Sequence, residues 1–101
     1  MISSESADTW SPWLDFDVPT ISGIPESAGV FSMHAAMKIL FIGASQNLRS
    51  SLLECMSKSC VDKAKRFRYM TTDSPDKVKE QLIKDYTEKH NGILPLCMQS
   101  S

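Results

Sequence analysis

The sequence predicts an α+β fold, a small three-stranded antiparallel sheet flanked by helices. Two strand-like runs, residues 29–34 and 38–43, are separated by a link of three residues. A link this short cannot hold a crossover helix, which predicts that the two strands pair as an antiparallel hairpin. A third run at residues 65–71 alternates with the period of a strand, and helix-like segments follow the second and third runs.

The two runs of the hairpin differ in how their apolar residues are arranged. The first run alternates, with Phe31 and Met33 on one face and small or polar side chains on the other. The second run is apolar from Ile39 to Ile42, a pattern typical of a strand that is buried on both faces. We therefore expect the second run to be the central strand of the sheet.

Two helices are expected, one before and one after the third strand in the chain. The first should begin near Ser45, a residue type that caps helix N-termini, and end near Cys60. The second has the clearest start, because Ser74 suits the cap and Pro75 suits the first helical position. Asn91, which is followed by a glycine, is expected to end it.

The chain is expected to divide into three parts. Residues 1–22 are predicted to be an acidic, Trp-containing extension, partly disordered and partly packed on the domain. Residues 23–98 form the folded domain, and residues 99–101 are expected to be a disordered tail. Trp10 and Trp13 carry large apolar surfaces, which favours packing on the domain over an exposed partner-binding peptide.

The composition is ordinary for a soluble globular protein, with 42% hydrophobic and 23% charged residues. No apolar run reaches the ~18 residues that a membrane span needs, and the N-terminus lacks the basic and apolar regions of a secretory signal. Cys55, Cys60 and Cys97 form no metal-like pair and leave one odd thiol. These features predict a reduced protein of the cytoplasm with no membrane segment.

Charge is distributed unevenly along the chain. The residues before Lys38 include five acids and no base, whereas the rest hold eleven bases and seven acids, so the two parts carry −5 and +4. The basic part is a candidate surface for a polyanion. Its candidate nucleic-acid-binding residues are Lys38, Arg49, Lys63, Lys65, Arg66 and Arg68. The alternative is that these charges only form solvated helix faces and protected strand edges.

Several short motifs occur in a characteristic order between residues 24 and 96. They are Gly-Val-Phe at 29–31, Phe-Ile-Gly at 41–43, the helix entry at 44–49, Leu-Ile-Lys-Asp-Tyr at 82–86 and Lys-His-Asn at 89–91. Together they resemble the GIY-YIG nuclease superfamily, which includes the nuclease subunit of bacterial excision repair. The resemblance implies an α+β domain of the same architecture, with a nuclease site on the surface of its sheet.

The resemblance also implies a set of catalytic positions, which can be carried over residue by residue. The family uses two tyrosines, an arginine on the first helix and a glutamate on a later helix that holds one divalent metal. The tyrosine positions here are Phe31 and Phe41, the arginine position is Ser51 and the glutamate position is Lys79. Phenylalanine has no hydroxyl, so neither ring can donate a hydrogen bond or transfer a proton.

The remaining family positions are of two kinds. Asn91 matches the family's asparagine, and Gly29 and Gly43 match its structural glycines. Arg49 and Glu80 lie two and one residues from the expected arginine and glutamate positions, and they are the candidate replacements, with Glu80 also the candidate metal ligand. On an ideal helix these offsets turn the side chain by about 200° and about 100°, respectively.

We therefore expect a GIY-YIG endonuclease-like domain that is catalytically impaired or inactive and acts as a nucleic-acid-binding or accessory module in DNA processing. The first alternative is a protein-interaction module that uses the former active-site face. The second is an active metal-dependent DNA endonuclease with relocated catalytic groups. No cofactor is expected unless the protein is an active nuclease, in which case it is Mg²⁺ or Mn²⁺. The expected partners are DNA or another protein, with no membrane.

Two other motifs lead to less favoured interpretations. Residues 39–45 also resemble the first strand-turn-helix of a nucleotide-binding α/β fold, where a helix N-terminus favours phosphate. One glycine stands where a glycine-rich loop is typical, and no Gly-Lys-Ser/Thr follows. His34 and His90 have no cysteine or carboxylate at ligand spacing, so a structural zinc site is not expected.

Overall fold

The computed structural model describes residues 10–35 and 38–98. These residues form one antiparallel sheet in the order β1-β4-β2-β3. The expected α+β class is confirmed, and the sheet has a fourth strand of two residues that was not expected. In chain order the elements are β1 (Leu14–Asp15), α2 (Val18–Ile21), β2 (Gly29–Ala35), β3 (Lys38–Ser45), α3 (Leu48–Cys55), η1 (Val61–Lys63), β4 (Arg66–Thr71), α4 (Pro75–Lys89) and η2 (Leu96–Met98).

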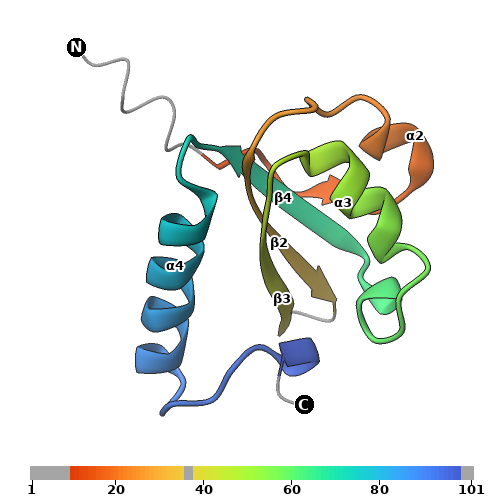
Figure 1. The fold of residues 1–101 in the computed structure, drawn as a ribbon. Helices are drawn as coiled ribbons and strands as arrows, with labels where there is room; N and C mark the ends of the chain where they lie inside the picture. Colours follow the sequence, from red (N-terminus) through yellow and green to blue (C-terminus); the bar gives the residue numbers. More distant parts are fainter. Residues whose placement is uncertain (1–9, 36–37, 99–101) are drawn as a thin grey trace.

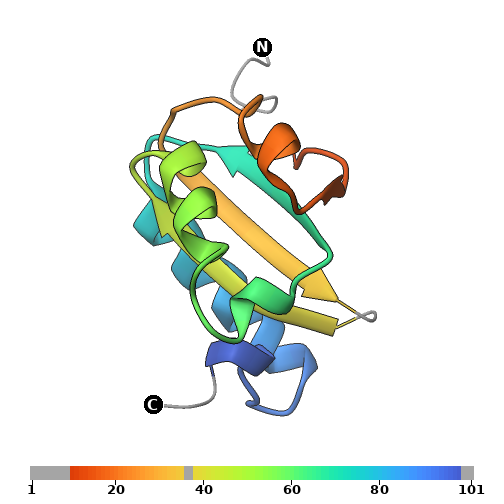
Figure 2. The same ribbon diagram turned by 90° about the vertical axis from the view of Figure 1, so that its right-hand side faces the viewer.

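The helices cover both faces of the sheet, α3 on one and α4 on the other (Figures 1 and 2). The α3 face carries the main core, in which Met33 of β2 and Phe67 of β4 are fully buried. Leu48 and Leu52 of α3 pack against them. On the opposite face, Pro75 is the only residue of α4 that is buried.

The hairpin of β2 and β3 is present, but its order in the sheet differs from the prediction. β2 pairs with both β3 and β4 and is therefore the central strand, while β3 lies at the edge. The expectation that residues 39–42 form the central strand is therefore wrong. The edge strand is apolar because α4 and the C-terminal segment around η2 pack against it.

Helix α3 departs from the sequence prediction at both ends, and helix α4 departs from it in its cap. Helix α3 is capped by Asn47, whose side chain accepts a hydrogen bond from Ser50 N, so the expected cap at Ser45 is wrong. It ends at Cys55 rather than near Cys60. Helix α4 starts at Pro75 as expected, although Ser74 makes no side-chain cap hydrogen bond.

The N-terminal segment folds back along β4. Ser11 N donates to Tyr69 O at 2.8 Å, and β1 pairs in register with the start of β4. Further along, Asp17 caps α2 by accepting a hydrogen bond from Thr20 N at 3.0 Å. Ile21 is fully buried in the core. The disorder expected for the chain ends falls on residues 1–9 and 99–101, which lie outside the described residues.

The cysteines are not all reduced. Cys60 and Cys97, 37 positions apart, form a disulfide, and Cys55 is free and buried. The expectation of three reduced thiols is therefore wrong, because the chain's last turn brings Cys97 beside the segment after α3. Bridges of this kind are typical of oxidising compartments. Among the described residues, no helix is long and apolar enough to span a membrane.

Candidate functional site

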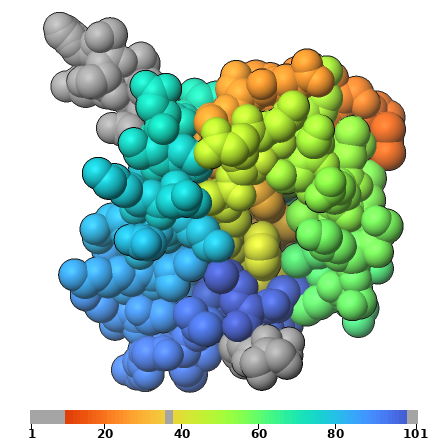
Figure 3. All heavy atoms as spheres, in the orientation of Figure 1, coloured from red at the N-terminus to blue at the C-terminus, as the bar shows by residue number. Residues whose placement is uncertain are grey.

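A pocket of about 280 Å³ lies between α3, β3, the start of α4 and the C-terminal segment. In the space-filling view the surface is hollowed between α3 and α4 (Figure 3). We call it the site pocket, and its lining is Phe31, Phe41, Gly43, Ala44, Ser51, Glu54, Cys55, Lys58, Ser59, Val61, Lys79 and Cys97. Four positions carried over from the nuclease family, Phe31, Phe41, Ser51 and Lys79, therefore line one pocket.

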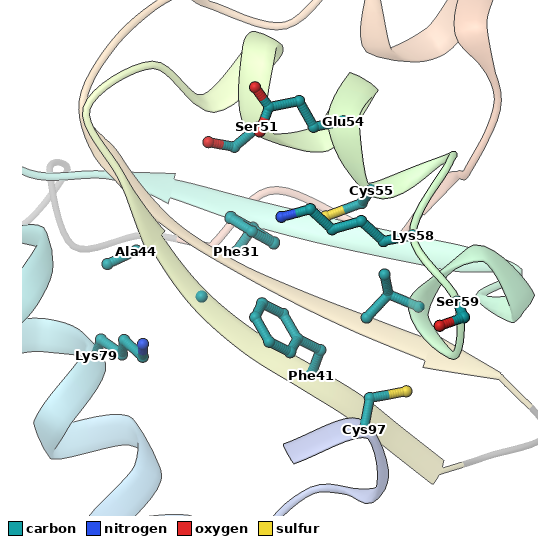
Figure 4. Close-up of a pocket in the computed structure, with 12 residues that line it drawn as sticks. Phe31, Phe41, Ala44, Ser51, Glu54, Cys55, Lys58, Ser59, Lys79 and Cys97 are labelled. Carbon is teal, nitrogen blue, oxygen red and sulfur yellow. The ribbon is translucent and has the colours of Figure 1, made fainter. Parts of the chain in front are cut away.

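Two aromatic rings form the floor of the site pocket (Figure 4). The rings of Phe31 and Phe41 have centroids 5.9 Å apart and are tilted by 34°. Gly43, which pairs with Phe31 across the hairpin, lies against both rings. A Cβ at Gly43 would lie 2.6 Å from an atom of each ring, so this close approach requires glycine.

The hydroxyl of Ser51, which the sequence resemblance aligns with the family's arginine, is hydrogen-bonded to its neighbours. Ser51 Oγ and Ser45 Oγ are 2.6 Å apart, which is a hydrogen bond with either oxygen as donor. Ser45 Oγ also accepts from Asn47 N at 2.9 Å. The network joins the end of β3 to the first turns of α3, and it orients the Ser51 hydroxyl at the rim of the pocket.

Three charged side chains line the site pocket, and two of them were missed in the sequence. Lys79 reaches in from α4 and Lys58 from the segment after α3, and both amino groups point inward (Figure 4). Glu54 is the one carboxylate of the lining. Helical spacing could have revealed Glu54, which follows Ser51 by three positions on α3, whereas Lys58 lies beyond the end of that helix.

The candidate replacements for the catalytic groups do not line the site pocket. Arg49 Nε donates to Ile24 O at 3.0 Å, and its guanidinium lies 3.5 Å from a Glu26 carboxylate oxygen. Glu80 is exposed on α4. Asn91 is exposed beyond the end of α4, with a φ of 58°, a left-handed conformation that ends the helix.

The site pocket does not fit a divalent cation. Within residues 10–35 and 38–98, no cluster of three or more His, Cys, Asp or Glu side chains is arranged to hold a metal. Mg²⁺ and Mn²⁺ prefer carboxylate oxygens, and the pocket offers one carboxylate beside two ammonium groups. Lys79, which the sequence resemblance aligns with the family's metal ligand, contributes one of these ammonium groups.

The structure divides the basic residues that were candidates for nucleic-acid binding. Arg66 forms an ion pair with Asp15, and Arg49 is tied to Glu26 as described above. Arg68 lies over two indole rings on the α4 face of the sheet. The three lysines of the set are exposed near the end of the sheet where the β2–β3 hairpin turns: Lys38, Lys63 and Lys65.

The fold is similar to that of GIY-YIG endonuclease domains. Two crystal structures of the GIY-YIG N-terminal endonuclease domain of UvrC from Thermotoga maritima align with a TM-score of 0.57. Their sequences are 16% and 15% identical to this chain, and each alignment covers 78% of this chain and 90% of that domain. Both are tyrosine-to-phenylalanine point mutants bound to the catalytic divalent cation.

The chain belongs to a sequence family described as Domain of unknown function (DUF7508), whose model matches residues 9–89. The matched region covers every strand of the sheet and all of α3 and α4. A comparison with curated proteins finds no match. The GIY-YIG-like fold that the short motifs implied is confirmed.

Proposed function

We propose that the site pocket binds the phosphate backbone of DNA without hydrolysing it, as an accessory module in DNA processing. The observation that carries this proposal is the convergence of Lys58 and Lys79 on a pocket with one carboxylate, Glu54. The charged lining is therefore +1 overall at neutral pH, counting these three side chains. Lysine binds phosphate as a point charge, and positive charge attracts the DNA backbone from a distance.

The aromatic floor suits a nucleic acid in a second way. Phe41 is only partly buried and packs at about 6 Å from Phe31, so its ring borders the open space of the pocket. Every nucleobase has a flat face that can stack on an aromatic side chain, whatever the sequence. A phosphate held between the lysines with a base on the Phe41 ring is the arrangement that we propose.

The absence of hydrolysis is inferred from the charge of the site more than from the missing hydroxyls. The UvrC domains bind their catalytic cation even though one tyrosine has been replaced by phenylalanine. A single hydroxyl is therefore dispensable for the cation in that protein. In this chain Lys79 occupies the glutamate position, and an ammonium group repels a divalent cation rather than binding it.

Binding is tested by fluorescence anisotropy with labelled single-stranded, duplex and branched DNA at several salt concentrations. Affinity should fall steeply with salt, and Lys58→Gln and Lys79→Gln should each weaken it and reduce the slope of log K against log salt by about 0.7–0.9. Lys77→Gln is the matched control, because Lys77 is exposed on α4 and does not line the site pocket. Absence of binding at low salt, or equal losses in all three variants, would refute the proposal.

Hydrolysis is tested with the same DNA in Mg²⁺ or Mn²⁺. We expect no cleavage. Cleavage that is lost in Glu54→Gln or Glu80→Ala would show an active nuclease with relocated groups, and the proposed loss of chemistry would then be wrong. Glu88→Gln is the control for nuclease contamination, because Glu88 is exposed near the far end of α4.

The alternative function, a protein-interaction module, has one observation in its favour. Leu96, next to Cys97 at the rim of the site pocket, is 52% exposed, and Ile93 before it is 54% exposed. An apolar partner would bind more tightly as salt rises, whereas DNA would bind less tightly. The salt dependence of binding therefore separates the two functions.

A further inference from the structure

A second cavity, of about 240 Å³, lies on the α4 face of the sheet, separate from the site pocket. The C-terminal half of α4 forms one wall, and the N-terminal segment at Trp10 and the strands β2, β3 and β4 form the rest. Its polar and charged lining comprises Ser32, Arg68, Asp85, Tyr86, Lys89 and His90. We call it the Arg68 cleft.

The guanidinium of Arg68 has no anionic partner among the described residues. The other two arginines of the chain have one, Arg49 with Glu26 and Arg66 with Asp15. The Nε atom of Arg68 is buried without a hydrogen-bond partner. Burial lowers the pKa of Arg68, but an arginine in a protein keeps its charge at neutral pH. A buried donor without a partner is costly, and a ligand oxyanion would supply the missing acceptor.

Two tryptophans fix the orientation of this guanidinium. Its Cζ lies 4.5 Å from the ring centroid of Trp10 and 4.6 Å from that of Trp13. The guanidinium therefore lies over both indole rings, where cation–π attraction holds it. Its N–H donors lie in the plane of the group, where carboxylate and phosphate oxygens bind in pairs.

The rest of the cleft suits a ring attached to that oxyanion. Tyr86 and His90 are stacked at 3.8 Å with an angle of 11°, which forms a stiff aromatic wall. Apolar side chains of β3 and α4 complete the lining, among them Ile42 and Leu82. Lys89 adds a second positive charge, and Asp85 opposes it with one negative charge.

We propose that the Arg68 cleft is a binding site for a small oxyanion carried on a flat ring, with Arg68 and Lys89 holding the oxyanion and the Tyr86–His90 wall holding the ring. The shared chemistry has two sources, an aromatic carboxylate and a nucleoside monophosphate. The cleft volume of about 240 Å³ is below the usual range of pockets for drug-sized ligands, so the occupant must be a small molecule. This site does not depend on the function proposed for the site pocket.

Intrinsic fluorescence measures the proposed binding directly, because Trp10 and Trp13 are the only tryptophans of the chain and both contact Arg68. Benzoate, adenosine monophosphate and inorganic phosphate are titrated separately into the full chain. A saturable change with benzoate or the nucleotide, and a weaker one with phosphate alone, is expected. The stronger of the first two ligands identifies the source.

Variants separate the cleft from general anion binding, with calorimetry as a second readout because changes at Arg68 alter the tryptophan signal. Arg68→Gln should lower affinity about ten- to hundredfold, the loss expected for charge-assisted hydrogen bonds. Arg68→Lys should lose most of it too, because the planar fork is lost. Arg66→Gln is the matched control, on the same strand and face but outside the cleft. Asp85→Asn should raise the affinity.

Three outcomes would overturn the proposal. The first is no binding of any probe at millimolar concentration to a folded wild-type chain. The second is equal weakening by Arg66→Gln and Arg68→Gln, which would indicate non-specific attraction of anions. The third is unchanged affinity in Arg68→Gln variants that melt like the wild type by circular dichroism.

Discussion

Phe31 on β2 and Phe41 on β3 place their rings 5.9 Å apart at the floor of the site pocket, although nine residues separate them in the chain. The hairpin register brings them together, because Phe31 pairs with Gly43 and Met33 pairs with Phe41. The two rings are therefore diagonal neighbours on one face of the sheet, within reach of each other for aromatic side chains. The missing side chain of Gly43 leaves the space that the rings occupy.

Adding a methyl group at Gly43 should strain this floor. A Cβ there would lie 2.6 Å from atoms of both phenylalanine rings, so Gly43→Ala should lower the free energy of unfolding by about 1–3 kcal/mol. Chemical denaturation measures the loss. Gly23→Ala is the control, because a Cβ at Gly23 meets its nearest atom, Thr20 O, at 3.6 Å. Equal stability of the two variants would contradict the tight packing at Gly43.

Substitution at Gly29 should be more damaging than at Gly43. A Cβ at Gly29 would lie 2.4 Å from the backbone oxygen of Met70 and 2.8 Å from Leu48 Cδ1. The oxygen belongs to β4, the neighbouring strand, and backbone cannot turn aside as a side chain can. Gly29→Ala should therefore lower the unfolding midpoint in urea further than Gly43→Ala. The reverse order would show that β2 and β4 can separate without cost.

Arg49 is expected to act in stability and not in DNA binding. Its Nε donates to Ile24 O, and the guanidinium also pairs with the Glu26 carboxylate, with about a third of the side chain exposed. Arg49→Ala should lower the free energy of unfolding by about 1 kcal/mol, a value reduced for solvent screening. Its DNA affinity and salt slope should match the wild type, in contrast to Lys58→Gln.

Reduction of the Cys60–Cys97 bridge should destabilise the domain. The bridge joins cysteines that are 37 positions apart, and the loss of such a constraint on the unfolded chain corresponds to about 4 kcal/mol in the chain-entropy model. Urea denaturation with and without a reducing agent measures the difference. The double variant Cys60→Ser with Cys97→Ser should resemble the reduced wild type and be insensitive to the reducing agent. Sensitivity of the double variant would contradict this assignment.

Cys55 should make stability depend on pH in the alkaline range. Burial raises the pKa of its thiol above the usual value of 9.0, with small effects of opposite sign from Lys58 and Glu54. Because the folded-state pKa is the higher one, this contribution to stability is fully present below pH 9.0 and is lost as the pH rises through the folded-state pKa. The free energy of unfolding of Cys55→Ala should not show this fall at alkaline pH. A pH profile identical to that of the wild type would contradict the prediction.

The same property predicts slow alkylation of the native thiol. The thiolate is the nucleophile, and a raised pKa keeps Cys55 protonated at neutral pH, while burial limits access. Iodoacetamide should therefore modify Cys55 much more slowly in the folded chain than in urea, as measured by mass spectrometry. Equal rates in the two conditions would show that the pocket side of α3 opens readily.

Local sequence patterns predicted which main segments are strands and which are helices, because the signals for a hairpin and for a helix start involve residues close together in the chain. The three-residue link predicted the β2–β3 hairpin, and the proline at residue 75 predicted the start of α4. The order of the strands was wrong, because the apolar run at 39–42 is explained by a helix and a C-terminal segment that pack on an edge strand. Such packing brings together residues that are distant in the chain, so one segment of the sequence cannot predict it.

The candidate site could be predicted in part. The motifs led to Phe31, Phe41, Ser51 and Lys79, which line one pocket. Glu54 and Lys58 were missed. Glu54 follows Ser51 at helical spacing, whereas Lys58 lies in the segment after α3. Arg49 and Glu80 were chosen because they are close in the chain to the expected positions. Neither Arg49 on α3 nor Glu80 on α4 lines the pocket.

The sequence by itself determined the α+β class and the hairpin, because each of these follows from residue types and spacing. Only the tertiary structure decided that β2 is central, that Cys60 meets Cys97, and that Arg68 lies between the N-terminal segment and α4 with no ion pair to residues 10–35 or 38–98. The physical reason is that burial and charge pairing depend on which surfaces contact each other. These contacts are set by the fold of the whole chain, and neighbouring residues alone do not specify them.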